Sequence, residues 1–203
     1  MTFIYKYGTY IFFLTFIFFP KNMQGQKFTG SAVLGVNLAQ IDGDFLYGYH
    51  KIGLTGGAKI GYSLDKNKYL NLEFLYSERG SAVKLFETNP DKKYTLRYLE
   101  IPVILSIHDW YRDKKDYHVV RADLGFSYGA LFQLEVPPVV KEEDFRSNDI
   151  SYVLGAAVQF TKHIGLSVRY TRSFFDMLQT TLDDGREISF RGYFITTRME
   201  YRF

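Results

Sequence analysis

Apolar and polar side chains alternate along the C-terminal stretch of the chain, residues 191–203. One face of this stretch carries Tyr193, Ile195, Thr197, Met199, Tyr201 and Phe203, and the other carries Phe194, Thr196, Arg198, Glu200 and Arg202. A period of two predicts a β-strand with one apolar and one mostly charged face. Such a strand can cover a soluble core, or it can cross a membrane as part of a barrel.

The same alternation recurs along the chain and predicts eight amphipathic strands. They cover residues 28–38, 51–64, 69–79, 94–107, 117–132, 152–160, 164–172 and 191–203. Each strand is long enough to cross a bilayer at a tilt, which takes about 9–11 residues. The pattern therefore fits membrane-spanning strands as well as it fits a soluble sheet.

The connections between these strands decide between the two readings. Short or moderate connections at 65–67, 108–116 and 161–163 alternate with longer ones at 39–50, 80–93, 133–151 and 173–187. Outer-membrane barrels have short periplasmic turns and longer external loops, whereas a soluble meander has no reason to keep this alternation. The sequence therefore predicts an all-β fold, an eight-stranded antiparallel up-and-down transmembrane β-barrel.

Charges that interrupt the apolar face support this prediction. Glu78, Arg97, Arg172 and Arg191 have lipid-facing parity, and all four fall at the outer ends of their predicted strands. A cation on the lipid face costs about 2–4 kcal/mol at the bilayer midplane and about 0–1 kcal/mol near the interface. The sequence places these charges where the smaller cost applies.

The N-terminal segment has the features of a secretory signal peptide. Lys6 precedes an apolar run at 10–19, Pro20 ends that run, and cleavage is expected near Gln26. We therefore expect a signal peptide at 1–25 and an outer-membrane barrel domain at 26–203. An uncleaved anchor is the alternative, although the apolar run is short for a span. Export and an even number of strands place both ends of the barrel in the periplasm and the long loops outside.

Composition excludes several other classes of protein. The body of the chain has no apolar run long enough for a helical span. Cysteine is absent, so disulfides and thiolate chemistry are excluded. The net charge is +3, and Lys6 and Lys21 supply two of these charges ahead of Gln26. A nearly neutral body gives no reason to expect nucleic acid as a partner.

Three stretches are similar to a known family. They are Leu-Glu-Phe-Leu-Tyr-Ser-Glu-Arg-Gly at 72–80, Tyr-Leu-Glu-Ile-Pro at 98–102, and Arg-Tyr-Thr at 169–171 followed by Phe175 and Asp176. With the terminal strand, they resemble the PorT-like outer-membrane β-barrel family over essentially the whole mature chain. Relatives often have Gln-Lys-Gly where this chain has Glu-Arg-Gly at 78–80. The resemblance implies the barrel fold and the outer membrane, and it suggests a link to type IX secretion or gliding, in which the family's namesake takes part.

Pro102 lies inside the fourth predicted strand, where it lacks an amide hydrogen for the ladder. We expect a β-bulge there, or a locally strained strand. The resemblance accounts for Pro102 as a feature of the family.

The polar faces of the strands predict a charged barrel interior. The side chains with inward parity are Lys59, Glu73, Arg79, Glu100, Arg121, Asp123, Arg169, Arg198, Glu200 and Arg202. The interior of an eight-stranded barrel is just wide enough for side chains to fill, and buried charges must pair or stay hydrated. We therefore expect an ion-pair network that fills the lumen, with a narrow conduction path as the alternative.

Catalytic and metal chemistry are weakly supported. A lipid-modifying enzyme would need a nucleophile and His arrangement on the outer surface. His108, His118 and His163 fall near predicted periplasmic turns and His50 in an outer loop, which indicates scattered, solvent-exposed rings. No spacing of His and acids indicates zinc. The loop acids Asp42, Asp44, Asp183 and Asp184 could bind Ca²⁺ weakly, but solvated loop acids are commoner.

These patterns predict a monomeric barrel that is not an enzyme and has no cofactor. Its expected role is structural or partner-binding, through external loops or periplasmic turns, with a narrow channel or a lipid-modifying enzyme as alternatives. We expect outer-membrane lipid to surround it and the barrel-assembly machinery to insert it. Tyr201 and Phe203 close the last strand with the aromatic residues that serve as an assembly signal in outer-membrane barrels.

Overall fold

The computed structural model describes residues 27–43, 48–137, 144–181 and 187–203. The expected signal peptide at 1–25 and its cleavage site at Gln26 lie outside these residues. The strands are β1 (Phe28–Asp42), β2 (Lys51–Asp65), β3 (Lys68–Ala82), β4 (Lys93–Arg112), β5 (Tyr117–Glu135), β6 (Asn148–Gln159), β7 (Ile164–Ser173), β8 (Leu178–Thr181) and β9 (Glu187–Arg202), and a 3₁₀ turn, η1 (Pro90–Lys92), precedes β4. In these segments no helix is long and apolar enough to cross a membrane.

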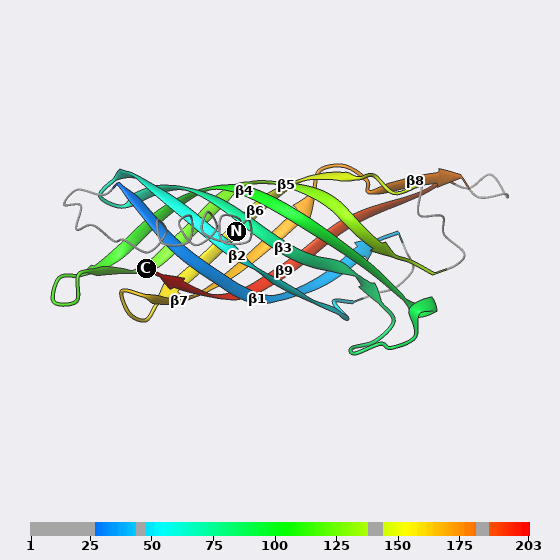
Figure 1. The fold of residues 1–203 in the computed structure, drawn as a ribbon, viewed down its shortest axis with the longest axis horizontal. Coiled ribbons are helices and arrows are strands. Elements are labelled where there is room, and N and C mark those ends of the chain that lie inside the picture. The colour runs from blue at the N-terminus through cyan, green and yellow to red at the C-terminus, as the bar shows by residue number, and fades with distance from the viewer. Residues whose placement is uncertain (1–26, 44–47, 138–143, 182–186) are drawn as a thin grey trace, which may run out of the picture.

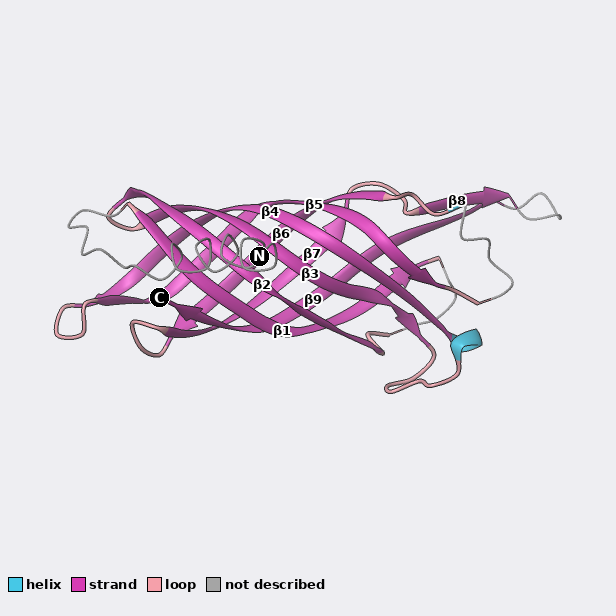
Figure 2. Ribbon diagram, in the orientation of Figure 1, coloured by secondary structure: helices cyan, strands magenta, loops and turns pink. Residues whose placement is uncertain are grey.

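Eight of the strands close into an antiparallel barrel (Figures 1 and 2). Strands β1 to β7 pair in sequence order, and β9 pairs with β7 on one side and with β1 on the other. In the closing pair, Ser31 lies opposite Arg202 and Asp42 lies opposite Arg191. This confirms the predicted eight-stranded up-and-down barrel.

The barrel has two unlike ends. At the short-turn end lie the turns at 66–67, 113–116 and 160–163, the start of β1 and the end of β9. At the opposite, long-loop end, β1 ends and β2 begins, and the same holds for β3 and β4, for β5 and β6, and for β7 and β9; β8 lies between β7 and β9 in the sequence. The predicted alternation of shorter and longer connections is therefore present.

Strand β8 was not predicted. It pairs with the first residues of β9, from Leu178 opposite Phe190 to Thr181 opposite Glu187, and extends the wall beyond the barrel as a hairpin. Phe145 forms an isolated antiparallel bridge with Leu178. Four residues are too few to show a period of two, so the sequence carried no clear signal for this strand.

Side chains follow the predicted inside-out arrangement. Leu34, Leu54 and Phe126 on the outer face are 61–70% exposed, whereas Glu73 and Arg198 on the inner face are 0% and 2% exposed. A soluble protein would bury the first set and expose the second. The outer face therefore suits lipid and the inner face holds the polar core.

Pro102 produces no β-bulge, so the first of the two expected alternatives was wrong. Leu72 pairs with Val103 and Leu75 pairs with Glu100, so the register is the same on both sides of Pro102. Between these pairs, Glu73 and Phe74 have no ladder partner on β4. Pro102 lacks the amide hydrogen that this part of the ladder needs, so the pairing opens locally without inserting a residue. The register shift of β4 against β5 lies instead between Arg97 and Tyr98.

An apolar cluster closes the long-loop end of the barrel. It consists of Ile41, Tyr94, Leu96, Tyr98, Phe145, Met177, Leu178 and Phe190, all of which are buried. The backbone amide of Met177 donates to Phe190 O at 2.6 Å, which ties the segment before β8 to β9. We call this cluster the apolar cap, because it lies where the lumen meets the long loops.

Candidate functional site: the charged lumen

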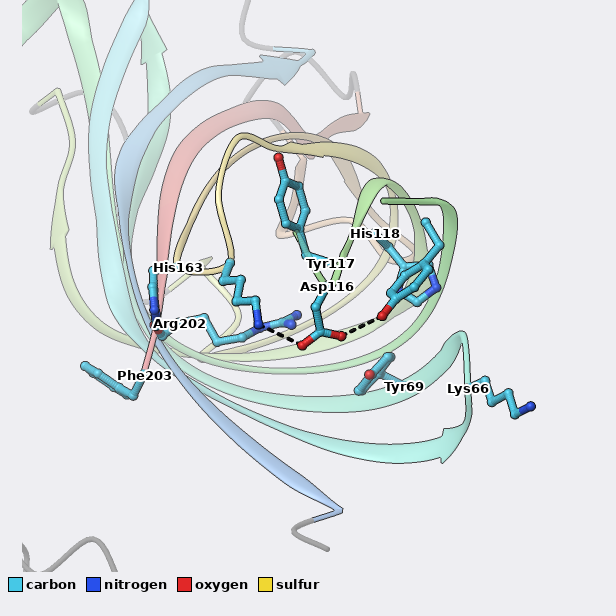
Figure 3. A pocket seen from close by; sticks show the side chains of 10 residues that line it. Lys66, Tyr69, Asp116, Tyr117, His118, His163, Arg202 and Phe203 are labelled. Atoms are coloured by element: carbon cyan, nitrogen blue, oxygen red, sulfur yellow. Dashed lines mark hydrogen bonds and ion pairs between the residues drawn. The ribbon is translucent and has the colours of Figure 1, made fainter. Parts of the chain in front are cut away.

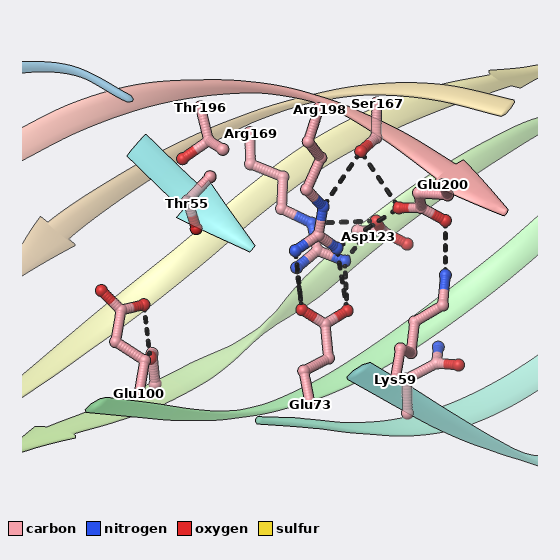
Figure 4. Close-up of polar contacts among 12 residues, drawn as sticks. Thr55, Lys59, Glu73, Glu100, Asp123, Ser167, Arg169, Thr196, Arg198 and Glu200 are labelled. Atoms are coloured by element: carbon pink, nitrogen blue, oxygen red, sulfur yellow. Dashed lines mark hydrogen bonds and ion pairs between the residues drawn. The ribbon is translucent and has the colours of Figure 1, made fainter. Parts of the chain in front are cut away.

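Glu73 is the centre of the charge network inside the barrel (Figure 4). It projects inward from β3, and its two carboxylate oxygens accept paired hydrogen bonds from Arg169 of β7 at 2.9 and 3.0 Å. Arg198 of β9 donates a second pair at 2.8 and 2.9 Å. One fully buried carboxylate thus joins strands from opposite parts of the chain through bidentate bonds, the strongest geometry for this type of pair.

Glu200 forms a second centre, closer to the short-turn end. Arg121 donates to both of its oxygens at 2.7 and 2.8 Å, and Lys59 forms an ion pair with it. Ser167 donates to it at 3.0 Å, and Arg198 reaches it at 3.3 Å. Arg198 therefore links the two carboxylate centres.

Asp123 connects the same two centres along a second path. Arg121 donates to it at 2.9 and 3.1 Å, and Arg169 at 3.0 and 3.2 Å. The hydroxyl of Ser106 donates a further hydrogen bond at 2.5 Å. Every oxygen of this buried carboxylate has a donor, as a buried charge requires.

Arg79 forms a third centre beneath the apolar cap. Its guanidinium pairs with Glu100 and, at 2.7 Å, with Asp149. The faces of Tyr98 and Phe194 lie 4.4 and 4.5 Å from the guanidinium carbon. Two aromatic faces and two carboxylates surround this cation, so it contributes cation–π as well as ionic contacts.

The structure buries and pairs nine of the ten residues predicted for the lumen. Arg202 differs, because it is only half-buried and forms no ion pair with the described residues. Asp149, which was not predicted, joins the network in its place. Five cations then face five anions, and the buried network is electrically neutral.

Asp149 was missed because the sixth strand was predicted to start at Tyr152. The strand starts at Asn148, and Asp149, Ser151 and Val153 continue its inward face. Extending the alternation of Val153 backwards by four residues would have placed Asp149 inside the barrel.

The side chains of the described network pack closely around a small void. The void among its side chains is about 20 Å³ and is lined by residues such as Thr55, Glu100, Arg169 and Arg198. This is room for about one water molecule. The middle of the lumen is a packed polar core in the part of the barrel that the structure describes.

Charges on the outer face also lie in pairs, near the long-loop end. Glu78 is 2.5 Å from Lys51 and 3.3 Å from Arg97, and Arg97 reaches Glu135 at 2.6 Å. Two further pairs are Arg172 with Asp42 at 3.4 Å and Arg191 with Asp176 at 2.7 Å. These are the four lipid-parity charges noted in the sequence, and each has a partner.

The histidines do not all occupy turns. Strand β4 continues to Arg112, so His108 lies inside the barrel, 7% exposed and with its ring 4.6 Å from that of Tyr69. The expectation that it is a solvent-exposed turn residue was wrong, because inward parity continues past the predicted end of the strand. His118 is half-buried in β5, and His163 is exposed in a turn. In the described segments no Ser or Thr hydroxyl bonds to a His ring.

The candidate Ca²⁺ ligands are only partly described. Asp42 is exposed and pairs with Arg172, while Asp44, Asp183 and Asp184 lie outside the described residues. Among the residues that are described, no group of three or more His and acidic side chains is arranged to hold a metal ion.

A family model described as the outer membrane protein beta-barrel domain matches residues 24–179. The chain belongs to this family and is a small outer-membrane β-barrel protein. Among curated proteins, none matches it significantly.

Several solved structures show a distant likeness. Neisserial surface protein A is 10% identical, with a TM-score of 0.48, over 88% of this chain and 98% of the other. Ail, the attachment invasion locus protein of Yersinia pestis, is 15% identical, with a TM-score of 0.47, over 88% and 100%. The outer membrane protein OprG of Pseudomonas aeruginosa is 12% identical, with a TM-score of 0.42, over 87% and 94%.

Removing the charge of Glu73 should destabilise the barrel strongly. Glu73→Gln leaves Arg169 and Arg198 without their shared carboxylate, and breaking a buried pair in this way costs about 3–5 kcal/mol. We expect urea unfolding in detergent or lipid, followed by the mobility shift of the folded barrel, to show a loss of this size. The matched control is Glu135→Gln, which removes an outer-face carboxylate that is 47% exposed and should change stability by less than about 1 kcal/mol. Equal effects of the two substitutions would contradict the structural role of Glu73.

Proposed function

We propose that this protein is a non-conducting, non-enzymatic barrel whose role is structural or partner-binding. The observation that carries this proposal is the packed charge network in the described part of the lumen, where the void beside Glu100, Arg169 and Arg198 measures only about 20 Å³. A conduction path would need a continuous column of water, and an eight-stranded barrel has no spare width for one once side chains fill it.

The arrangement of charges also supports a closed lumen. Arg169 and Arg198 each bind both carboxylate oxygens of Glu73. An ion crossing the barrel would have to break these ion pairs. At the long-loop end it would also have to pass the apolar cap, where Leu96 and Leu178 are fully buried. Both barriers are made of side chains held by several strands, so neither resembles a mobile gate.

If the lumen is closed, the protein would contact its partners through the two ends of the barrel. We propose that the short-turn end faces the periplasm and the long-loop end faces the outside, as signal-peptide export with cleavage near Gln26 implies. Barrel-assembly machinery would insert the protein and would read Tyr201 and Phe203 as part of a C-terminal assembly signal. The inserted protein would be a monomer that presents its loops or turns to a protein partner. A link to type IX secretion or gliding rests on the resemblance to the PorT-like family alone.

Purified protein should show no steady conductance in planar lipid bilayers. The reason is the packed network, which leaves no water column through the lumen. The sample should first be shown to be folded and inserted, by its mobility shift and by protection of the barrel from protease. Stable, ion-selective openings of folded protein would overturn the proposal, and openings altered by Arg169→Gln would assign the current to the lumen.

Single cysteines should reveal the orientation, since the chain has no native cysteine. Lys84→Cys at the long-loop end replaces a side chain that is 70% exposed, and Lys66→Cys replaces an exposed residue of a short turn. On whole cells we expect a membrane-impermeant thiol reagent to label the first variant and not the second. Both should react once the outer membrane is permeabilised. The opposite labelling on intact cells would reverse the proposed orientation.

A further inference from the structure

A pocket of about 660 Å³ opens at the short-turn end of the barrel (Figure 3). Its walls come from the turn at 113–116, the starts of β3 and β5, the turn at 160–163 and the last residues of β9. Volumes of this size are typical of small-molecule sites. The pocket lies outside the packed network, whose own void is far smaller.

Arg202 carries the one charge on the inward face of β9 that the network does not neutralise. Two residues deeper, both oxygens of Glu200 are already engaged by Arg121, and Lys59 and Ser167 add further contacts. Arg202 is half-buried, points into the pocket (Figure 3) and forms no ion pair with the described residues. Removing a guanidinium partly from water without giving it an anion costs free energy. An external anion that pairs with Arg202 would recover part of this cost.

The other charges at the pocket are already matched or point away. Lys162 lies 2.7 Å from Asp116, and the hydroxyl of Tyr111 donates to the same carboxylate at 2.5 Å. The hydrogen bond from Lys162, and then that from Tyr111, lower the pKa of Asp116, which holds it ionised. Lys66 points outward in Figure 3. Arg202 is therefore the cation that remains open to a ligand.

Tyr69, Tyr111 and His118 line the pocket with aromatic rings, and the buried ring of His108 lies between those of Tyr69 and His118. The ring of Tyr69 lies 4.6 Å from that of His108, His108 lies 5.7 Å from His118, and His118 lies 5.0 Å from Tyr111. These rings pack against one another in a continuous series, so their positions do not depend on a ligand. Aromatic faces of this type accept a flat or apolar group by stacking.

We propose that the mouth of the barrel at the short-turn end binds an organic carboxylate that carries a ring or another apolar body. The guanidinium of Arg202 would take the carboxylate by two parallel hydrogen bonds, and the Tyr69 to Tyr111 wall would take the body. This site does not depend on which side of the membrane the short turns face, and it is separate from the sealed lumen.

Isothermal titration of the detergent-solubilised full chain at low salt tests the proposal. The probes are 3-phenylpropanoate, its neutral amide and inorganic phosphate. We expect 3-phenylpropanoate to bind, and the amide and phosphate to bind at least tenfold more weakly, because each lacks one half of the recognised group. Arg202→Gln should weaken binding of 3-phenylpropanoate at least tenfold, and Arg202→Lys should lose less, because it keeps the charge.

The matched control is Lys114→Gln, which removes an exposed cation from the turn at 113–116 but does not alter a residue that lines the pocket. It should bind 3-phenylpropanoate as the wild type does. Arg202→Gln should unfold at the wild-type temperature, because Arg202 has no ion pair with the described residues to lose. This result would separate a binding defect from a folding defect. Wild-type affinity in Arg202→Gln, equal binding of the amide, equal binding of phosphate, or no binding of 3-phenylpropanoate at millimolar concentration would each overturn the proposal.

Discussion

Ten ionised side chains share the interior of a barrel that lipid surrounds, and they must neutralise one another within it. A single buried charge without a partner costs several kcal/mol, and water cannot supply the missing partner where no space is left. Glu73 neutralises Arg169 and Arg198 at once. Asp123 pairs with Arg169, and Glu200 pairs with Arg121. Because the partners come from β2, β3, β5, β7 and β9, the requirement also fixes which strands face each other across the lumen.

The barrel consequently changes character along its axis. An apolar cap that includes Leu96 and Leu178 fills the long-loop end, the neutral network fills the middle, and a pocket beside Arg202 opens at the short-turn end. The two packed layers are the basis of our proposal that the barrel does not conduct. The open layer holds the site that we propose for an organic carboxylate, and the exposed loops and turns are the surfaces that we propose for a protein partner.

Parity along each strand was sufficient to predict the barrel and nine members of the network, because a period of two assigns every residue of a known strand to one face. It failed where the ends of a strand were misjudged, as for Asp149 and His108. It could not say which cation meets which anion, since that depends on the tilt and stagger of strands distant in sequence. The effect of Pro102 was also beyond reach, because a missing amide can be absorbed by a bulge or by an open ladder position.

A double-mutant cycle on Glu73 and Arg198 tests the central claim of a mutually dependent network most directly. The two side chains are joined by bonds of 2.8 and 2.9 Å. Unfolding free energies would be measured in lipid for the wild type, Glu73→Gln, Arg198→Gln and the double variant. Coupled residues in one network show interaction energies of about 0.5–3 kcal/mol, and we expect the double variant to be less destabilised than the sum of the singles by an amount in the upper half of that range. Additive losses within about 0.3 kcal/mol would show that the two residues do not stabilise each other, and would contradict the account.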